Sequence, residues 1–214
     1  MPIAAINPVW SVLAVNMLPV FGAAVFGWSV LTLMLFYWFE NIVLGVINAV
    51  KMLIEGLASH SAISAATLVF LLPFFAFHYG LFCGVHGIFL FALFGGPEGI
   101  DDNFDIPDLP GRVFDILTAN SMAMWSAVLM VAFHLFVFCV DWLANARWKG
   151  VEPAVQMFVP YGRIVLVHVT IIFGGFIVLL FGQPILAAAL LALLKTGAEV
   201  GRIRLTDTRE TLAE

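Results

Sequence analysis

The stretch FFAFHYGLFCGVHGIFLF, residues 74–91, is apolar enough to cross a lipid bilayer, yet it contains two histidines, His78 and His86. It belongs to a longer run, residues 62–94, that has no charged residue. Crossing the hydrocarbon of a bilayer takes about 20 apolar residues in a helix, so this run predicts a transmembrane helix. Because ionisable side chains in such helices usually face the interior of the bundle, we expect both imidazoles to face other helices.

The composition of the whole chain extends this expectation to the class of protein. Of 214 residues, 63% are hydrophobic and 11% are charged, and the mean hydropathy is +1.07. Soluble domains carry about 25% charged residues, so this chain could not cover a globule with polar surface. The lipid bilayer is therefore the expected partner and nucleic acid is not. Cys83 and Cys139 lie in apolar runs and predict no disulfide framework.

The lengths of the apolar stretches predict an all-α fold, a polytopic membrane bundle of about six transmembrane helices. Their lengths favour helices over buried strands. Pro73 falls inside the third stretch, where a tilt or kink is expected. The transmembrane domain covers residues 1–194 and a tail covers 195–214. The expected spans are residues 8–25, 28–54, 62–94, 113–146, 163–181 and 184–194.

The placement of charges predicts the orientation of this bundle. With six crossings, Lys51, the basic residues at 147–163 and those of the tail fall on one side, and only Arg112 falls on the other. The loop on that other side, residues 95–112, is acidic and rich in proline and glycine. Basic loops stay in the cytoplasm, so both termini are expected to be cytoplasmic.

Four predicted helices each carry one ionisable residue at a similar depth. At 1.5 Å per residue, Glu40 and His78 lie near the middle of their segments, and His134 and His168 lie about 7 Å to the cytoplasmic side of theirs. Three imidazoles and one carboxylate are a ligand set that suits zinc or iron. We therefore expect these four residues to form a polar, metal-binding centre. For each residue alone, an ordinary interhelical hydrogen bond explains the position equally well.

Two further residues are expected at other depths. His86 lies about 12 Å from His78 along the helix axis, so the two imidazoles cannot bind one ion, and His86 is expected in the outer half of the membrane. Asp141 follows His134 by one heptad and is expected on the same face, about 10 Å nearer the cytoplasm. In a metal-dependent enzyme, Glu40 would be a ligand or the general base, and Asp141 would support the site.

Three stretches, YWFENIVLGVINAVKM (37–52), FHYGLFCGVHGIF (77–89) and YGRIVLVHVTIIFGGF (161–176), resemble a family of bacterial integral-membrane proteins known only as a domain of unknown function. The resemblance implies a multi-pass protein of the bacterial inner membrane. It also implies that Asn41, His86 and Arg163 belong to the family's pattern, although the family supplies no activity. We expect these three residues to take part in cofactor binding. The other residues of the implied pattern are Glu40, His78, His168 and the pair Gly174–Gly175.

Four functions remain open from the sequence, and enzymatic activity is not decided. One is a metal-dependent membrane enzyme acting on a lipid or small-molecule substrate, although GxSxG, HExxH and HxxxH are absent. A second is a b-type haem protein with two histidines from different helices as axial ligands. The third is a proton or ion transporter in which Asp141, His134, Glu40, His78 and His86 line a path. The fourth is an accessory subunit of a membrane complex, and a homo-oligomer is left open.

Overall fold

The computed structural model describes residues 27–59, 62–95, 100 and 105–162, together with single residues and short pieces at 21, 25, 164–166, 168–169, 173, 180, 190, 193–194, 196–197 and 200–201. This part of the chain is helical and contains no strand, which confirms the all-α class. The expected spans at 8–25, 163–181 and 184–194 lie largely outside the described residues. The number of six spans therefore stays a prediction.

Three helices in the described part are long and apolar enough to cross a membrane. The first is α2 (Val30–Ala58). The second is α3 (Ala62–Phe94), which runs through Pro73 without interruption and whose spanning part begins at Ala66. The third is Ser121–Ala144, made of α5 (Ser121–Val137) and a π-helical segment (Phe138–Ala144). Proline is tolerated in membrane helices, so Pro73 does not end α3.

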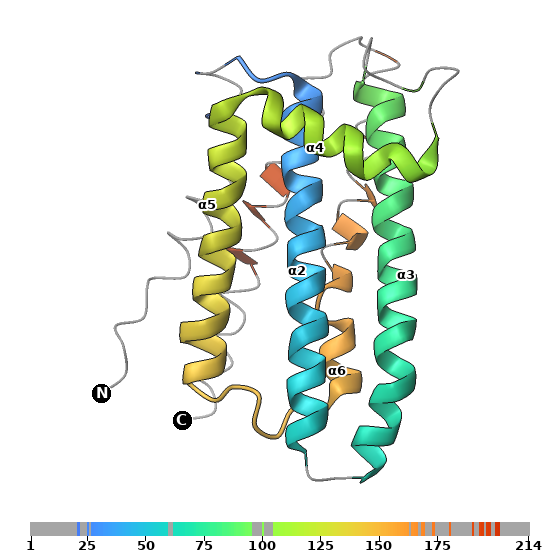
Figure 1. The fold of residues 1–214 in the computed structure, drawn as a ribbon, viewed down its shortest axis with the longest axis vertical. Coiled ribbons are helices and arrows are strands. Elements are labelled where there is room, and N and C mark those ends of the chain that lie inside the picture. Colours follow the sequence, from blue (N-terminus) through green and yellow to red (C-terminus); the bar gives the residue numbers. More distant parts are fainter. Residues whose placement is uncertain are drawn as a thin grey trace.

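Helix α2 is the centre of the bundle. Figure 1 shows α2 between α3 and α5, with α4 (Leu109–Ala119) crossing one end and α6 (Pro153–Phe158) beside the opposite half of α2. Leu31, Leu35 and Phe36 of α2 are almost completely buried. A helix that is apolar on nearly all sides belongs in the middle of a bundle, and α2 accordingly contacts α3, α4, α5 and α6.

Close approach fixes the register between α2 and α3. The phenol ring of Tyr79 lies against Gly45, where an added Cβ would stand 2.9 Å from Tyr79 Cδ1. The indole N–H of Trp38 donates a hydrogen bond to the carbonyl of Cys83 at 2.7 Å. Small residues let membrane helices approach each other closely. The two helices therefore run antiparallel with the level of Trp38 opposite Cys83.

Residues 113–146 were expected to form one span, but two helices form instead because the helix breaks at Asn120. This residue is extended (φ −114°, ψ 115°), and its side chain accepts hydrogen bonds from the backbone N–H groups of Met122 (2.9 Å) and Ala123 (3.2 Å). Asparagine is among the best N-caps, so a new helix, α5, begins there. Helix α4 instead lies across the end of the bundle, after a 3₁₀ turn at Ile106–Asp108 (Figure 1).

Charged residues lie at both ends of the bundle. At the end where α2 finishes, Lys51 Nζ lies 5.2 Å from the ring centroid of Trp142, and Arg147 lies 3.1 Å from Asp141. Around α4, at the other end, Asp105 and Asp108 are exposed. Lys51 and Arg147 thus lie at one end together with Asp141, and Asp105 and Asp108 lie at the other end with Arg112 of α4. The orientation in the membrane stays a prediction.

Candidate functional site

The most buried ionisable contact described joins α2 to α5. Nε2 of His134 lies 3.1 Å from Oε1 of Glu40, whose side chain is 2% exposed, while that of His134 is 13% exposed. Ala123 and Ala127 of α5 are small and pack in the same α2–α5 contact, which lets the helices come close enough for the pair to form. Because the span begins at Ser121 rather than at 113, His134 lies only about 2 Å from its centre along the axis.

A carboxyl and an imidazole at this distance can share a proton. The contact is compatible with two positions of the proton. In the first, the carboxylate accepts a hydrogen bond from an imidazolium, and in the second a carboxylic acid donates one to a neutral imidazole. A buried charge is stable only when it is paired and hydrogen-bonded, and the imidazole of His134 supplies such a pairing for Glu40. The pair can therefore bind and release a proton inside the bundle without a large rearrangement.

A second contact joins α3 to the segment that follows α6. Nδ1 of His86 lies 2.7 Å from the carbonyl oxygen of Phe82, and Nε2 of His86 lies 3.0 Å from Nδ1 of His168. A carbonyl only accepts, so in the neutral pair His86 Nδ1 donates to it and His86 Nε2 must accept from His168. This assignment leaves Nε2 of His168, an exposed side chain, as an acceptor nitrogen.

The third contact holds His78 against Tyr161. Nδ1 of His78 lies 2.8 Å from the hydroxyl of Tyr161, and the aromatic rings of Phe74 and Phe82 lie 5.3 Å and 5.1 Å from the imidazole. Tyr161 follows α6 in a segment expected to be a cytoplasmic connection. Between Pro153 and Tyr161 this segment is apolar apart from one polar side chain. That apolar sequence is the signal that could have indicated the inward packing.

Amides on α2 are also buried. Asn41 Nδ2 donates to the carbonyl of Tyr37 (3.2 Å), and the hydroxyl of Tyr79 donates to the carbonyl of Asn41 (2.9 Å). Asn48 and Gln156 bond reciprocally, with Gln156 Nε2 donating to Asn48 Oδ1 at 2.6 Å and Asn48 Nδ2 donating to the carbonyl of Gln156 at 3.2 Å. The sequence did not indicate Gln156 or Tyr161, because α6 reaches these helices only through the tertiary fold.

The structure distributes the expected four-residue centre over separate contacts. Glu40 meets His134, His78 meets Tyr161, and His168 meets His86. No three His, Cys, Asp or Glu side chains gather as a metal site would among the described residues. The physical reason is the position of α2, which lies between α3 and α5 and keeps the histidines of those two helices apart (Figure 1).

Asp141 does not extend the face of His134, as its heptad spacing had suggested. It lies in the π-helical segment, is about half exposed (47%) and pairs with Arg147 at 3.1 Å. A π-helix bonds residue i to i+5, so the rotation per residue changes and the heptad relation no longer holds. Two other expected features, Arg163 and the pair Gly174–Gly175, lie outside the described residues.

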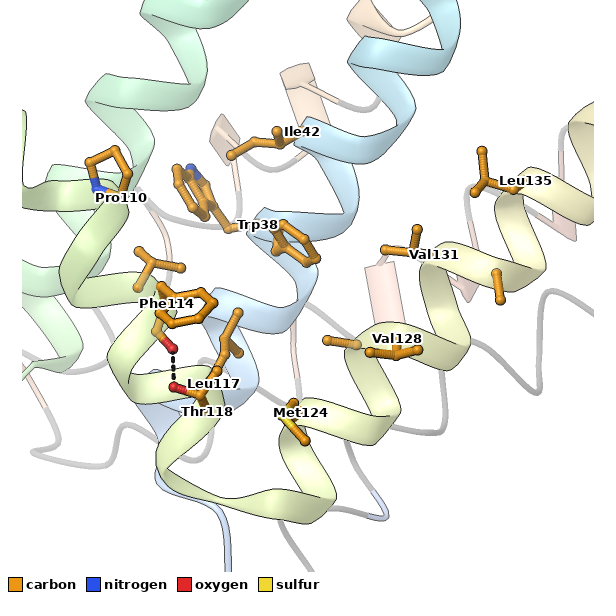
Figure 2. A pocket seen from close by; sticks show the side chains of 14 residues that line it. Trp38, Ile42, Pro110, Phe114, Leu117, Thr118, Met124, Val128, Val131 and Leu135 are labelled. Carbon is orange, nitrogen blue, oxygen red and sulfur yellow. Dashed lines mark hydrogen bonds between the residues drawn. The ribbon is translucent and has the colours of Figure 1, made fainter.

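An apolar cavity of about 740 Å³ lies between α2, α4 and α5, and its lining includes neither Glu40 nor His134. Figure 2 shows Trp38 and Ile42 of α2 facing Leu117 of α4 and Val131 of α5 across it. The hydroxyl of Thr118 at its edge donates to the carbonyl of Phe114 within α4, at 2.8 Å. The described walls therefore suit hydrocarbon rather than a polar ligand.

In the part of the chain that the structure describes, helices alone are present, three of them are candidate membrane spans, and imidazoles make contacts between segments. These features suggest the class of helical membrane proteins with buried ionisable groups. The sequence matches the model of a family of unknown function, DUF6498, over residues 4–214, so the chain belongs to that family. The match agrees with the resemblance to a domain of unknown function. No curated protein and no solved structure shows significant similarity to the chain.

Proposed function

We propose that this protein binds and transfers protons within the membrane, with the Glu40–His134 pair as its central proton-binding site. The observation that carries the proposal is a carboxyl only 2% exposed and 3.1 Å from an imidazole, on two helices long enough to span a bilayer. Ionisable residues inside membrane helices are costly and commonly mark proton relays or ion pathways. His134 is the more exposed partner, so protons reach Glu40 through the imidazole.

Proton flux into liposomes tests this function. Purified protein is reconstituted in vesicles that contain a pH-sensitive dye, and a potassium diffusion potential drives protons inward. We expect flux above that of empty vesicles and a loss of at least tenfold in Glu40→Gln, which keeps the size of the side chain but cannot titrate. The matched control is Asp141→Asn, because that carboxyl is paired with Arg147 at the surface, and it should leave the flux unchanged. Wild-type flux equal to that of empty vesicles refutes the proposal.

A metal ion at His86 and His168 is a second candidate, supported by one specific observation. Histidines that bind metals usually donate their other ring N–H to a carbonyl or carboxylate, which fixes the ring. His86 makes this contact with Phe82 while its other nitrogen faces His168. The two imidazoles would supply two nitrogen ligands to zinc or iron.

Elemental analysis and an optical spectrum distinguish this candidate. About one zinc or iron per chain, lost in the variant His86→Ala/His168→Ala and kept in His78→Ala, would support it. A Soret band in the same sample would point to haem instead. Protein purified without chelator and free of metal and colour would rule out both cofactors.

We further infer a bacterial inner-membrane protein with both termini in the cytoplasm. The support is the family resemblance and the basic end formed by Lys51 and Arg147, since basic residues favour the cytoplasmic side. Reporter fusions after residues 59 and 100 test the orientation. The first should report cytoplasm and the second periplasm, and the reverse pattern would overturn it.

A further inference from the structure

The carboxyl of Glu55 is buried at the end of α2 and belongs to none of the contacts above. Its side chain is 2% exposed, and neither carboxyl oxygen has a hydrogen-bond partner among the described residues. Buried polar groups are nearly always hydrogen-bonded, so each exception calls for an explanation. A carboxylate in this position would be far less stable than a neutral carboxylic acid.

The nearby cation is engaged elsewhere. Lys51 lies one turn before Glu55 on α2, but its ammonium lies over the ring of Trp142, 5.2 Å from the ring centroid. Four other charged groups are described at this end. Asp141 and Arg147 form an ion pair with each other at 3.1 Å, Lys149 Nζ lies over the ring of Trp148, 5.5 Å from the centroid, and Glu152 precedes α6. On the α3 side, Leu68 packs against Gly56, next to Glu55, and is apolar. The spacing of four residues would nevertheless let Lys51 turn back to Glu55.

Glu55 also continues a polar face of the central helix. Asn41, Asn48 and Glu55 are seven residues apart, which places them on one face of α2 over about 21 Å. All three are buried. The two asparagines are hydrogen-bonded to Tyr37 and Gln156, so Glu55 is the titratable end of this face. It lies at the end of the bundle that carries the basic residues.

We propose that Glu55 is a second proton-binding site, which holds its proton as a neutral carboxylic acid at neutral pH and exchanges it with water at the Lys51 end of the bundle. On release, the carboxyl becomes a carboxylate, the proton passes to water, and the Lys51 ammonium leaves Trp142 to pair with the carboxylate. Lys51 keeps its own protons throughout. This site does not depend on the Glu40–His134 pair, so either can fail alone.

Infrared titration of the reconstituted protein tests the site. The carbonyl stretch of a protonated carboxyl is recorded in wild type and in Glu55→Gln as the pH is raised. We expect a band at pH 7 that is missing in Glu55→Gln, kept in Glu40→Gln, and lost at higher pH. Identical spectra of wild type and Glu55→Gln at pH 7 would overturn the proposal, because Glu55 would then be ionised.

The variant Lys51→Gln tests whether Lys51 is the partner of the Glu55 carboxylate. Removing the ammonium removes the cation that stabilises the carboxylate, so the midpoint at which the Glu55 band disappears should move to higher pH. An unchanged midpoint would show that Lys51 is not the partner of the ionised form and would overturn that part of the mechanism. Neither readout uses proton flux, so the result stands whether or not the protein transports protons.

Discussion

Replacing His134 by alanine should destabilise the protein strongly, and a double-mutant cycle with Glu40→Gln should show why. For the ionised form of the pair, removing one partner of a buried charged pair costs about 3–5 kcal/mol, and Glu40 is only 2% exposed. The carboxyl can avoid this cost by taking up a proton, which for an ordinary glutamate at pH 7 costs roughly 3.7 kcal/mol (about 2.7 pH units at 1.36 kcal/mol each). We therefore expect a loss of about 4 kcal/mol.

The same substitution should cost far less when residue 40 is a neutral glutamine. Only a hydrogen bond and some packing are then lost, about 1 kcal/mol, so the coupling between the two positions should be about 3 kcal/mol. Unfolding by sodium dodecyl sulfate in bicelles, followed by helical circular dichroism, measures each free energy. His78→Ala is the control, because His78 bonds Tyr161 instead and its effect should add to that of Glu40→Gln. Additivity within about 0.5 kcal/mol for Glu40→Gln and His134→Ala would refute the reasoning.

Three further predictions use the same unfolding assay. Gly45→Ala should cost about 1–3 kcal/mol by overpacking against Tyr79, whereas Gly80→Ala, with open space at its Cβ, should be neutral or stabilising; equal effects would contradict the packing. Asn120→Ala should cost about 1 kcal/mol because α5 loses its N-cap, and no change would mean that the cap is not needed. Asn48→Leu should cost roughly 1–3 kcal/mol by leaving the amide of Gln156 unpaired, and Asn48→Leu/Gln156→Leu should cost less, not more.

The candidate site could be predicted in part because intramembrane polar residues are rare. Glu40, His78, His86, His134 and His168 stand out in apolar stretches, and each makes a polar contact in the structure. Their pairing could not be predicted, because depth along a helix says nothing of which helix is the neighbour. Depth alone grouped His168 with His78, whereas the fold pairs it with His86.

Two local backbone features were also not predicted from the sequence. The N-cap at Asn120 lies inside the stretch predicted as one span, residues 113–146, although Asp115, Thr118 and Ser121 are close to it in the sequence. The π-helical segment at Phe138–Ala144 moves Asp141 to the surface, and no residue pattern marked it. The break at Asn120 changed the depth of His134 in its span. The π-helical segment changed the face on which Asp141 lies, and therefore its partner.

The sequence by itself determined the class of this protein, because hydropathy over 20–30 residues depends only on composition, and a helix is the way a single apolar segment satisfies its backbone in lipid. The spans α2 and α3 could therefore be predicted, and so could the buried residues that need polar partners. The tertiary structure alone decided those partners. Lipid is as apolar as a leucine side chain, so hydrophobicity does not choose neighbours in a membrane, and close packing and hydrogen bonds do. Because α2 lies between α3 and α5, Glu40 contacts His134 of α5, while His78 and His86 of α3 lie on the opposite side of α2.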